Sequence, residues 1–262
     1  MSKMEKGEVD EKVVIEHLRE LRFKTSDEDL KALFQEKIDG EIGPMLVAIA
    51  RLAEVERAER QVRNLDSRTR IAALGKCISL DGFDWTHPKA IDRGLYEQLL
   101  SLDFIDDSYN VLFRGQSGTG KTTLAKTIGF KALQEGRTVR FTSLPSMVSE
   151  LLSQESIPAF TRKLRKYTGP DLLIIDEVGY LPCKNDAVDA FFNVISRRHE
   201  INSTILTTNL AFKEWGKFFQ GAACLSALVD RFVQHCHVMD IDATSWRMKN
   251  AIENAEKRKS TQ

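Results

Sequence analysis

The sequence predicts an α/β fold: a parallel five-stranded sheet flanked by helices, with a small all-helical domain before it. From residue 109 onward short apolar stretches alternate with longer amphipathic ones, which is typical of parallel strands joined by helices. Residues 1–80 instead carry apolar side chains at helical spacing among many charges. The 262 residues suffice for one sizeable domain and a smaller one. We therefore expect a helical N-terminal domain at 1–80, a linker at 81–108, a core at 109–249 and a flexible polar tail at 250–262.

Three helices are expected in the N-terminal domain. Apolar residues recur at helical spacing over residues 13–21. Thr25–Glu28 offers a capping box for the second helix, and Pro44 suits the first turn of the third.

A run of arginines follows in this domain, and it has two interpretations. It is either a solvated helix whose arginines pair with glutamates about four residues away, or an arm that contacts nucleic-acid phosphates. The formal net charge of the chain is zero, so only the clustering of basic residues bears on the question. The arginines are Arg57, Arg60, Arg63, Arg68 and Arg70.

The linker contains one dense aromatic cluster, Phe83-Asp84-Trp85. It is either a packing plug where the linker meets the core or part of a pocket for a nucleotide base, because apolar clefts at such junctions hold ligands.

Strand and helix patterns alternate through the core. Strands are expected at 111–114, 138–142, 172–176, 203–208 and about 237–241. Helices are expected between them, at 121–135, about 144–153, about 157–167, 187–200 and about 222–233.

A phosphate-binding loop follows the first strand and opens the first core helix. Its pattern is G-x-x-x-x-G-K-[ST], in the strand-to-helix context that the pattern requires. Glycines let the backbone approach an anion, and successive N–H groups with the helix N-terminus surround the phosphates. Lys121 is expected to reach the β- and γ-phosphates, and the Thr122 hydroxyl to hold Mg²⁺. The predicted ATP-binding residues are Gly115, Gln116, Ser117, Gly118, Thr119, Gly120, Lys121, Thr122 and Thr123.

Two carboxylates end the third core strand. Four apolar residues, 172–175, lead into Asp176 and Glu177, so a buried strand carries both acids to the open edge of the sheet. Asp176 is placed to hold Mg²⁺, and Glu177 to polarise a water for attack on the γ-phosphate. With the phosphate loop about fifty residues earlier, the pair predicts a Mg²⁺-dependent nucleoside triphosphatase.

Three more residues are candidates for the same chemistry. Asn209 follows the fourth strand, where it either orients the attacking water or caps the next helix. Arg231 and Arg247 could place a guanidinium on the developing phosphate charge, within one chain or from a neighbouring subunit. As isolated arginines they would be surface ion-pair residues.

The densest basic cluster of the core occupies residues 162–166. Such clusters are usually solvated, but four cations beside an aromatic residue make phosphate contacts plausible. The cations are Arg162, Lys163, Arg165 and Lys166. His235-Cys236-His237 resembles a metal fragment, but further ligands at zinc spacing are missing, which favours packing.

Composition excludes several classes of protein. The four cysteines form no C-x-x-C pair, and the charged N-terminus has no signal-peptide core, so we expect a cytoplasmic protein with reduced thiols. No apolar run reaches the length of a membrane helix, so no membrane partner is expected.

Several strings of residues extend the motifs described above: Gly115–Thr122, Leu172–Pro182, Ile195–Arg198, Ser203–Asn209, Phe212–Gly216 and Val229–Arg231. Together they resemble the IstB family, the ATPase helpers of insertion-sequence transposition, related to the DnaC helicase loaders and to the DnaA-type initiators of the AAA+ class. The resemblance covers about residues 46–249.

This resemblance implies a prokaryotic, ATP- and Mg²⁺-dependent ATPase that multimerises as a ring or helix on duplex DNA and recruits an IstA-like transposase. It implies that Lys121 and Thr122 belong to the phosphate loop and Asp176 with Glu177 to the acidic motif. It also makes Asn209 the first sensor, Arg231 a finger reaching the adjacent subunit, and Arg247 the second sensor.

The resemblance bears on the remaining segments too. It implies that residues 143–167 form a DNA-facing insertion, that Arg57–Arg70 match the basic N-terminal region of the family, and that Phe83–Trp85 lie near the adenine. Only about twenty residues follow the fifth strand, the polar tail included, so the helical lid of the AAA+ class should be vestigial.

Two alternatives remain. One is a DnaC-like helicase loader whose N-terminal helices grip a helicase. The other is a nucleotide-switched DNA-binding scaffold with negligible turnover. The number of subunits, the target-site preference, the surface that meets the transposase, the bending of DNA and the role of residues 1–40 do not follow from the sequence.

Overall fold

The computed structural model describes residues 11–22, 28, 42–76, 83–179, 185–219 and 224–249. Within the chain, two compact units are distinguished, Met1–Ser67 and Arg68–Gln262. In the described ranges no helix is both long and apolar enough to cross a membrane.

In its described residues the smaller unit is a helix pair. α1 (Glu11–Glu20) packs against α3 (Ile42–Ala72), whose last turn belongs to the larger unit. Pro44 lies in the first turn of α3, as predicted. The predicted second helix lies outside the described residues apart from Glu28. The apolar contact between the two helices is made by Val14, Ile15, Leu18, Leu21, Ala50 and Ala53.

The larger unit contains the predicted sheet of five parallel strands, in the order β2-β3-β4-β1-β5. β4 therefore lies between the strand that precedes the phosphate loop and the strand that carries the acids. The strands are β1 (Asn110–Gly115), β2 (Val139–Ser143), β3 (Leu172–Val178), β4 (Ser203–Thr208) and β5 (Cys236–Ile241).

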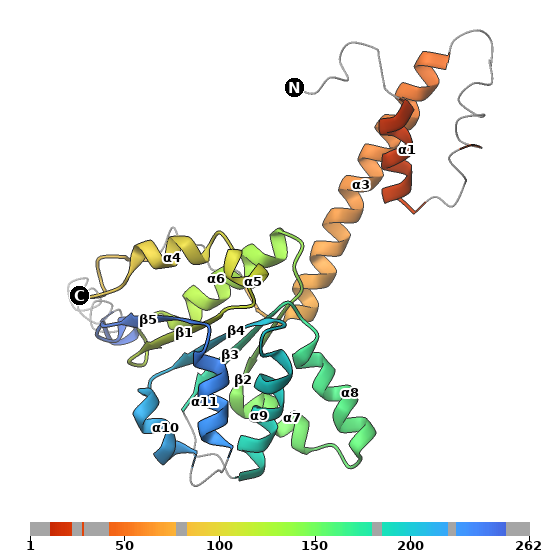
Figure 1. Cartoon of the computed structure of the whole chain (residues 1–262). Helices are drawn as coiled ribbons and strands as arrows, with labels where there is room; N and C mark the ends of the chain where they lie inside the picture. Colours follow the sequence, from red (N-terminus) through yellow and green to blue (C-terminus); the bar gives the residue numbers. More distant parts are fainter. Residues whose placement is uncertain are drawn as a thin grey trace, which may run out of the picture. The chain divides into compact units, whose positions relative to one another are not determined.

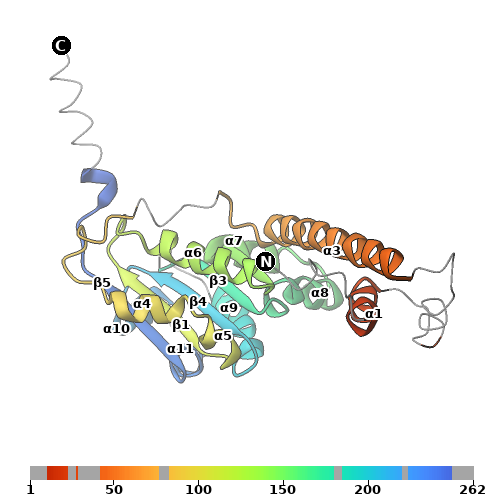
Figure 2. The same cartoon turned by 90° about the horizontal axis from the view of Figure 1, so that it is seen from above.

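Helices cover both faces of the sheet, as Figure 1 shows. On one face lie α4 (Arg93–Leu99), α5 (Asp103–Asp106) and α6 (Lys121–Gln134), which are in front of the strands in Figure 2. The opposite face carries α7 (Leu144–Leu152), α8 (Ile157–Thr168), α9 (Asn185–Arg198), α10 (Phe212–Phe218) and α11 (Leu225–Val233).

The core explains this layering. Leu112, Leu173 and Leu206 on the three central strands are fully buried under the helices of the second face. At the far end of the sheet from the phosphate loop, Arg198 is 1% exposed, and its guanidinium donates to Thr204 Oγ1 at 3.0 Å and to four backbone carbonyls. Burial lowers the pKa of Arg198 to about 9.

Candidate nucleotide site

The phosphate loop joins β1 to α6 in a conformation that only glycine adopts without strain. Gly118 and Gly120 have φ of 79° and 94°. A Cβ on Gly120 would lie 2.7 Å from the ring of Phe83, and one on Gly118 would collide with Ser245. α6 begins at Lys121, so its first N–H groups and its positive dipole end face the loop.

Lys121 lies inside this loop. Its Nζ donates to the carbonyl oxygens of Gly115, at 2.8 Å, and Gln116, at 2.6 Å. Burial lowers the pKa of Lys121 to about 8, with Arg247 adding to the effect and Asp176 opposing it. A phosphate dianion at the loop would favour the charged ammonium.

The first of the two predicted acids meets the loop directly. Asp176 is 8% exposed and accepts a hydrogen bond from Thr122 Oγ1 at 2.9 Å. Its carboxylate also accepts from the hydroxyl of Thr207 on β4. The structure thus brings together the loop threonine and the strand-end aspartate, which are 54 residues apart in the chain.

This pair fits a magnesium ion, which prefers hard oxygen donors and is usually held by one or two protein groups plus phosphate and water. Thr122 and Asp176 supply a hydroxyl and a carboxylate. Among the described residues no cluster of three or more His, Cys, Asp or Glu could hold a metal. His235 and His237 instead pack against Tyr109, with ring centroids 5.0 and 5.6 Å apart.

Glu177 follows in a strained conformation. Its φ is +63°, although it is not glycine, and strain of this kind clusters at functional sites. The side chain is exposed at the carboxyl edge of the sheet, next to Asp176. Because the strands are parallel, this is the same edge at which the phosphate loop follows β1.

A cavity of about 260 Å³ opens beside the loop. One wall is formed by the loop and the first residues of α6, Gly118–Thr123, and the other by aromatic and charged residues from the linker and the C-terminal segment. The residues of this second wall are Phe83, Asp84, His87, Pro88, Trp246 and Arg247. A cavity with a phosphate loop at one end and aromatic rings at the other has the form of a nucleotide pocket.

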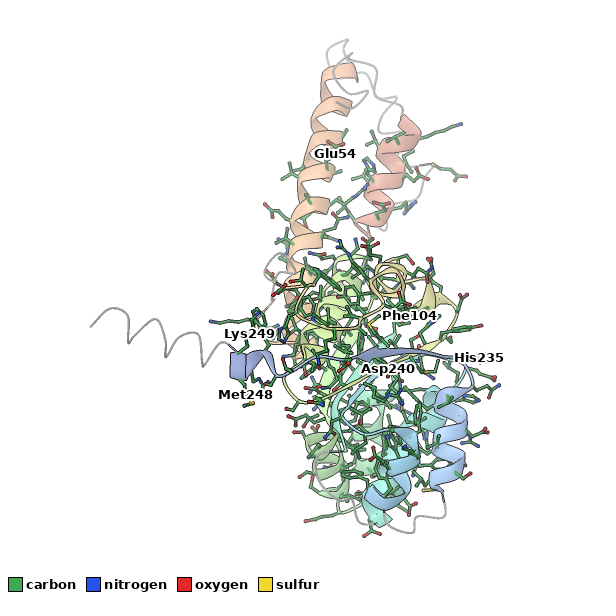
Figure 3. The ribbon with its side chains drawn as sticks, turned by 90° about the vertical axis from the view of Figure 1, so that its left-hand side faces the viewer. Glu54, Phe104, His235, Asp240, Met248 and Lys249 are labelled. Carbon is green, nitrogen blue, oxygen red and sulfur yellow. The ribbon has the colours of Figure 1, made fainter. Side chains whose placement is uncertain are left out.

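Contacts between the linker and the C-terminal segment build that wall. Ala90 and Asp242 form an antiparallel bridge, and His87 Nε2 lies 2.8 Å from the carbonyl oxygen of Thr244. The backbone N–H of Trp246 donates to the Gly118 carbonyl of the loop at 3.0 Å. Beyond β5, Met248 and Lys249 lie on a short helical turn (Figure 3).

The remaining candidates lie in different places. Arg247 lines the cavity. Asn209 is exposed directly after β4, next to Gly179. Arg231 does not line the cavity of its own chain; it lies on α11, donates to Ser196 Oγ at 2.5 Å and sits over the ring of Phe192.

The two groups of candidate DNA-binding residues differ in their partners. On α8, Arg162 and Arg165 are exposed, whereas Lys163 and Lys166 pair with Glu150 of α7 at 2.9 and 2.6 Å. Burial raises the pKa of Glu150, but hydrogen bonds from Lys166, Tyr167 and Lys163 outweigh it and hold the pKa at about 2.

Most candidate arginines of α3 are engaged within the chain, and Arg70 is exposed. The bonds are Arg57–Glu20 at 3.1 Å, Arg60–Glu56 at 2.6 Å, Arg63–Glu56 at 3.0 Å, Arg63–Glu59 at 3.2 Å, and Arg68 to the Gly136 carbonyl at 2.9 Å.

Sequence reasoning missed three contributors to this site. Thr207 contacts Asp176, and His87 and Trp246 line the cavity. A threonine in a strand is an ordinary β-former, so nothing in the sequence marked Thr207. The two aromatic residues belong to segments that meet only in the folded chain.

Comparisons with a family model and with individual proteins lead to the same group of proteins. Residues 16–254 match the model of the family described as IstB-like ATP binding protein. The chain is 34% identical over 209 residues to the protein described as the ATP-binding protein of insertion sequence IS5376 from Geobacillus stearothermophilus, covering 80% of this chain and 83% of that one. It is 35% identical over 201 residues to the corresponding protein of insertion sequence IS21 from Pseudomonas aeruginosa, covering 77% of this chain and 74% of that one.

Among solved structures, AMPPCP-bound DnaA from Aquifex aeolicus superposes with a TM-score of 0.55 at 21% identity. The match covers 71% of this chain and 56% of that one. The match confirms the predicted fold, a parallel five-stranded sheet flanked by helices.

Proposed function

The chain belongs to the family of IstB-like ATP-binding proteins, and from this premise we propose that it is a Mg²⁺-dependent ATPase acting on DNA in insertion-sequence transposition. The observation that carries the hydrolytic part is the contact of Thr122 with Asp176, beside Lys121 on one side and the strained Glu177 on the other.

Each residue has a role in this proposal. Lys121 and the loop N–H groups bind the β- and γ-phosphates, and Thr122 and Asp176 hold the magnesium ion, which neutralises charge on the phosphates. Glu177 orients and deprotonates the attacking water. Arg247 contacts the phosphates from within the chain, and Asn209 helps to orient the water.

The DNA and assembly part of the proposal rests on the family and on exposed cations. The protein binds duplex DNA as a ring or helix of identical subunits in a prokaryotic cytoplasm and recruits an IstA-like transposase. Arg162 and Arg165 on α8 contact phosphates. Arg231, which does not line the cavity of its own chain, completes the site of a neighbouring subunit.

One experiment tests the function as a whole: ATP hydrolysis by the wild-type chain and by Glu177→Gln, with Mg²⁺, with and without duplex DNA. We expect turnover that depends on Mg²⁺ and rises with DNA, and a loss of at least about a hundredfold in Glu177→Gln, as for removal of a general base. Wild-type protein that binds ATP and DNA but does not turn over would instead identify a nucleotide-switched scaffold.

A further inference from the structure

The two acids of β3 lie on a β-bulge. Ile175 pairs with Leu206 of β4 and Val178 pairs with Thr208, so Asp176 and Glu177 together stand opposite one residue, Thr207. Such an insertion interrupts the backbone hydrogen bonds of the ladder and re-aims side chains. Asp176 still pairs with Ser143 of β2, but on the side of β4 the two residues need other bonds to hold them in place.

Thr207 supplies those bonds from a fully enclosed position. It is 2% exposed. Its hydroxyl donates to Asp176 Oδ1, and the same oxygen accepts from the backbone N–H of Glu177 at 3.2 Å. One side chain thus contacts the carboxylate of the first acid and the backbone of the second.

The hydroxyl of Thr207 acts as a donor toward one acid and as an acceptor toward the other. The Thr207 hydroxyl has one proton, which goes to the carboxylate, and its lone pair receives the Glu177 N–H. This arrangement fixes the rotation of the Asp176 carboxylate toward Thr122 and holds Glu177 at its positive φ.

We propose that Thr207 is a positioning residue that sets the geometry of both acids: the carboxylate that holds Mg²⁺ and the backbone from which Glu177 meets the attacking water. The inference rests on the proposed ATPase function. Bonds of this kind orient metal ligands from behind, and their loss typically weakens metal binding ten- to a hundredfold.

Three variants test the proposal. Thr207→Val keeps the shape and removes the hydroxyl, and Thr207→Ser restores a hydroxyl. Thr204→Val makes the same change on the same strand, where Thr204 is 1% exposed and its hydroxyl bonds only to Arg198 in the described contacts. This control shows how far the loss of any buried hydroxyl from β4 changes the stability and the readouts.

Two readouts do not require turnover. The first is the Mg²⁺ concentration that half-saturates binding of a fluorescent ATP analogue. The second is hydrogen exchange of the Glu177 amide. We expect Thr207→Val to raise the half-saturating Mg²⁺ at least about tenfold and to accelerate exchange at Glu177, and Thr207→Ser to restore both. Thr204→Val should change neither, although it lowers the unfolding temperature.

The outcomes separate the two claims. If wild-type protein shows no Mg²⁺-dependent binding of the analogue, the proposed function itself fails. If wild-type binding depends on Mg²⁺ but Thr207→Val matches Thr204→Val in both readouts, the positioning role of Thr207 is overturned. A Thr207→Ser protein that behaves like Thr207→Val would overturn it as well.

Discussion

Glu177 is a candidate catalytic residue whose backbone conformation lowers the stability of the fold. A left-handed backbone costs a non-glycine residue about 1–2 kcal/mol, and Glu177 adopts it at φ +63°. Glycine tolerates this conformation but loses more chain entropy on folding. Replacing Glu177 by glycine would therefore relieve the strain, and the entropy loss would offset part of the resulting increase in stability.

We therefore predict that the free energy of unfolding of Glu177→Gly, measured by urea denaturation, exceeds that of the wild type by about 0.5–1 kcal/mol. The same variant should have lost ATP hydrolysis. Glu177→Gln is the control, because it removes the carboxylate and keeps the strain; its stability should match the wild type. A Glu177→Gly protein that is less stable than Glu177→Gln would contradict the claim that backbone strain at Glu177 lowers the stability of the protein.

Lys121 gives a prediction about pH. The pKa of its ammonium is about 8 in the nucleotide-free chain, below the ordinary value of about 10.4. A bound triphosphate raises that pKa, so binding near pH 8.5 takes up protons and weakens as the pH rises further. Calorimetric titration with ATP at pH 8.5, in buffers with different ionisation heats, should show net proton uptake. Binding heats that are independent of the buffer would contradict it.

These residues also show how far sequence reasoning reaches. Gly115–Thr122 and Asp176 with Glu177 were predictable because each motif is local and its spacing carries the chemistry. Thr207 was not, because its role depends on a bulge that exists only when β3 pairs with β4. The approach of His87 and Trp246 likewise depends on a contact between distant segments.

At the scale of elements, the α7–α8 contact divides the basic residues of α8 into paired and exposed ones. Glu150 ties Lys163 and Lys166 to α7, which leaves Arg162 and Arg165 exposed on the same helix. Cations already paired with a carboxylate release fewer counterions on meeting DNA than unpaired ones.

Affinity for duplex DNA falls as salt rises, and the steepness of log affinity against log salt reflects the number of phosphate contacts. We predict that Arg162→Ala with Arg165→Ala reduces the magnitude of this slope by about 2, one per lost phosphate contact. Lys163→Ala with Lys166→Ala removes the same formal charge from the same helix and should lower it by less. Fluorescence anisotropy between low and moderate salt measures both slopes. Equal slopes in the two double variants would contradict the distinction between them.

The predicted elements of the core were confirmed to within a few residues, because apolar strands and amphipathic helices follow from local periodicity. Three short helices were not foreseen: α4, α5 and α10 have four to seven residues, too short for a periodic signal. The ion pairs of Arg60 with Glu56 and of Arg63 with Glu59, each four residues away, match the solvated-helix interpretation of α3, whereas Arg57 pairs with Glu20 of α1. Their binding to DNA stays a prediction.

At the scale of the whole molecule, the proposed hydrolysis requires residues from two chains. Lys121, Thr122 and Arg247 line one cavity and Asp176 contacts Thr122, but Arg231 lies elsewhere, against Ser196 and Phe192. A guanidinium supplied by an adjacent subunit can raise phosphoryl-transfer rates by three to five orders of magnitude.

The most direct measurement is therefore ATP turnover in an equal mixture of Arg231→Ala and Glu177→Gln proteins, assembled with Mg²⁺ and duplex DNA. Each variant alone should be inactive. In the mixture about one site in four combines an intact Glu177 with an intact neighbouring Arg231, so we predict about a quarter of the wild-type rate. A mixture as inactive as its two components, with DNA binding of both variants intact, would contradict the account.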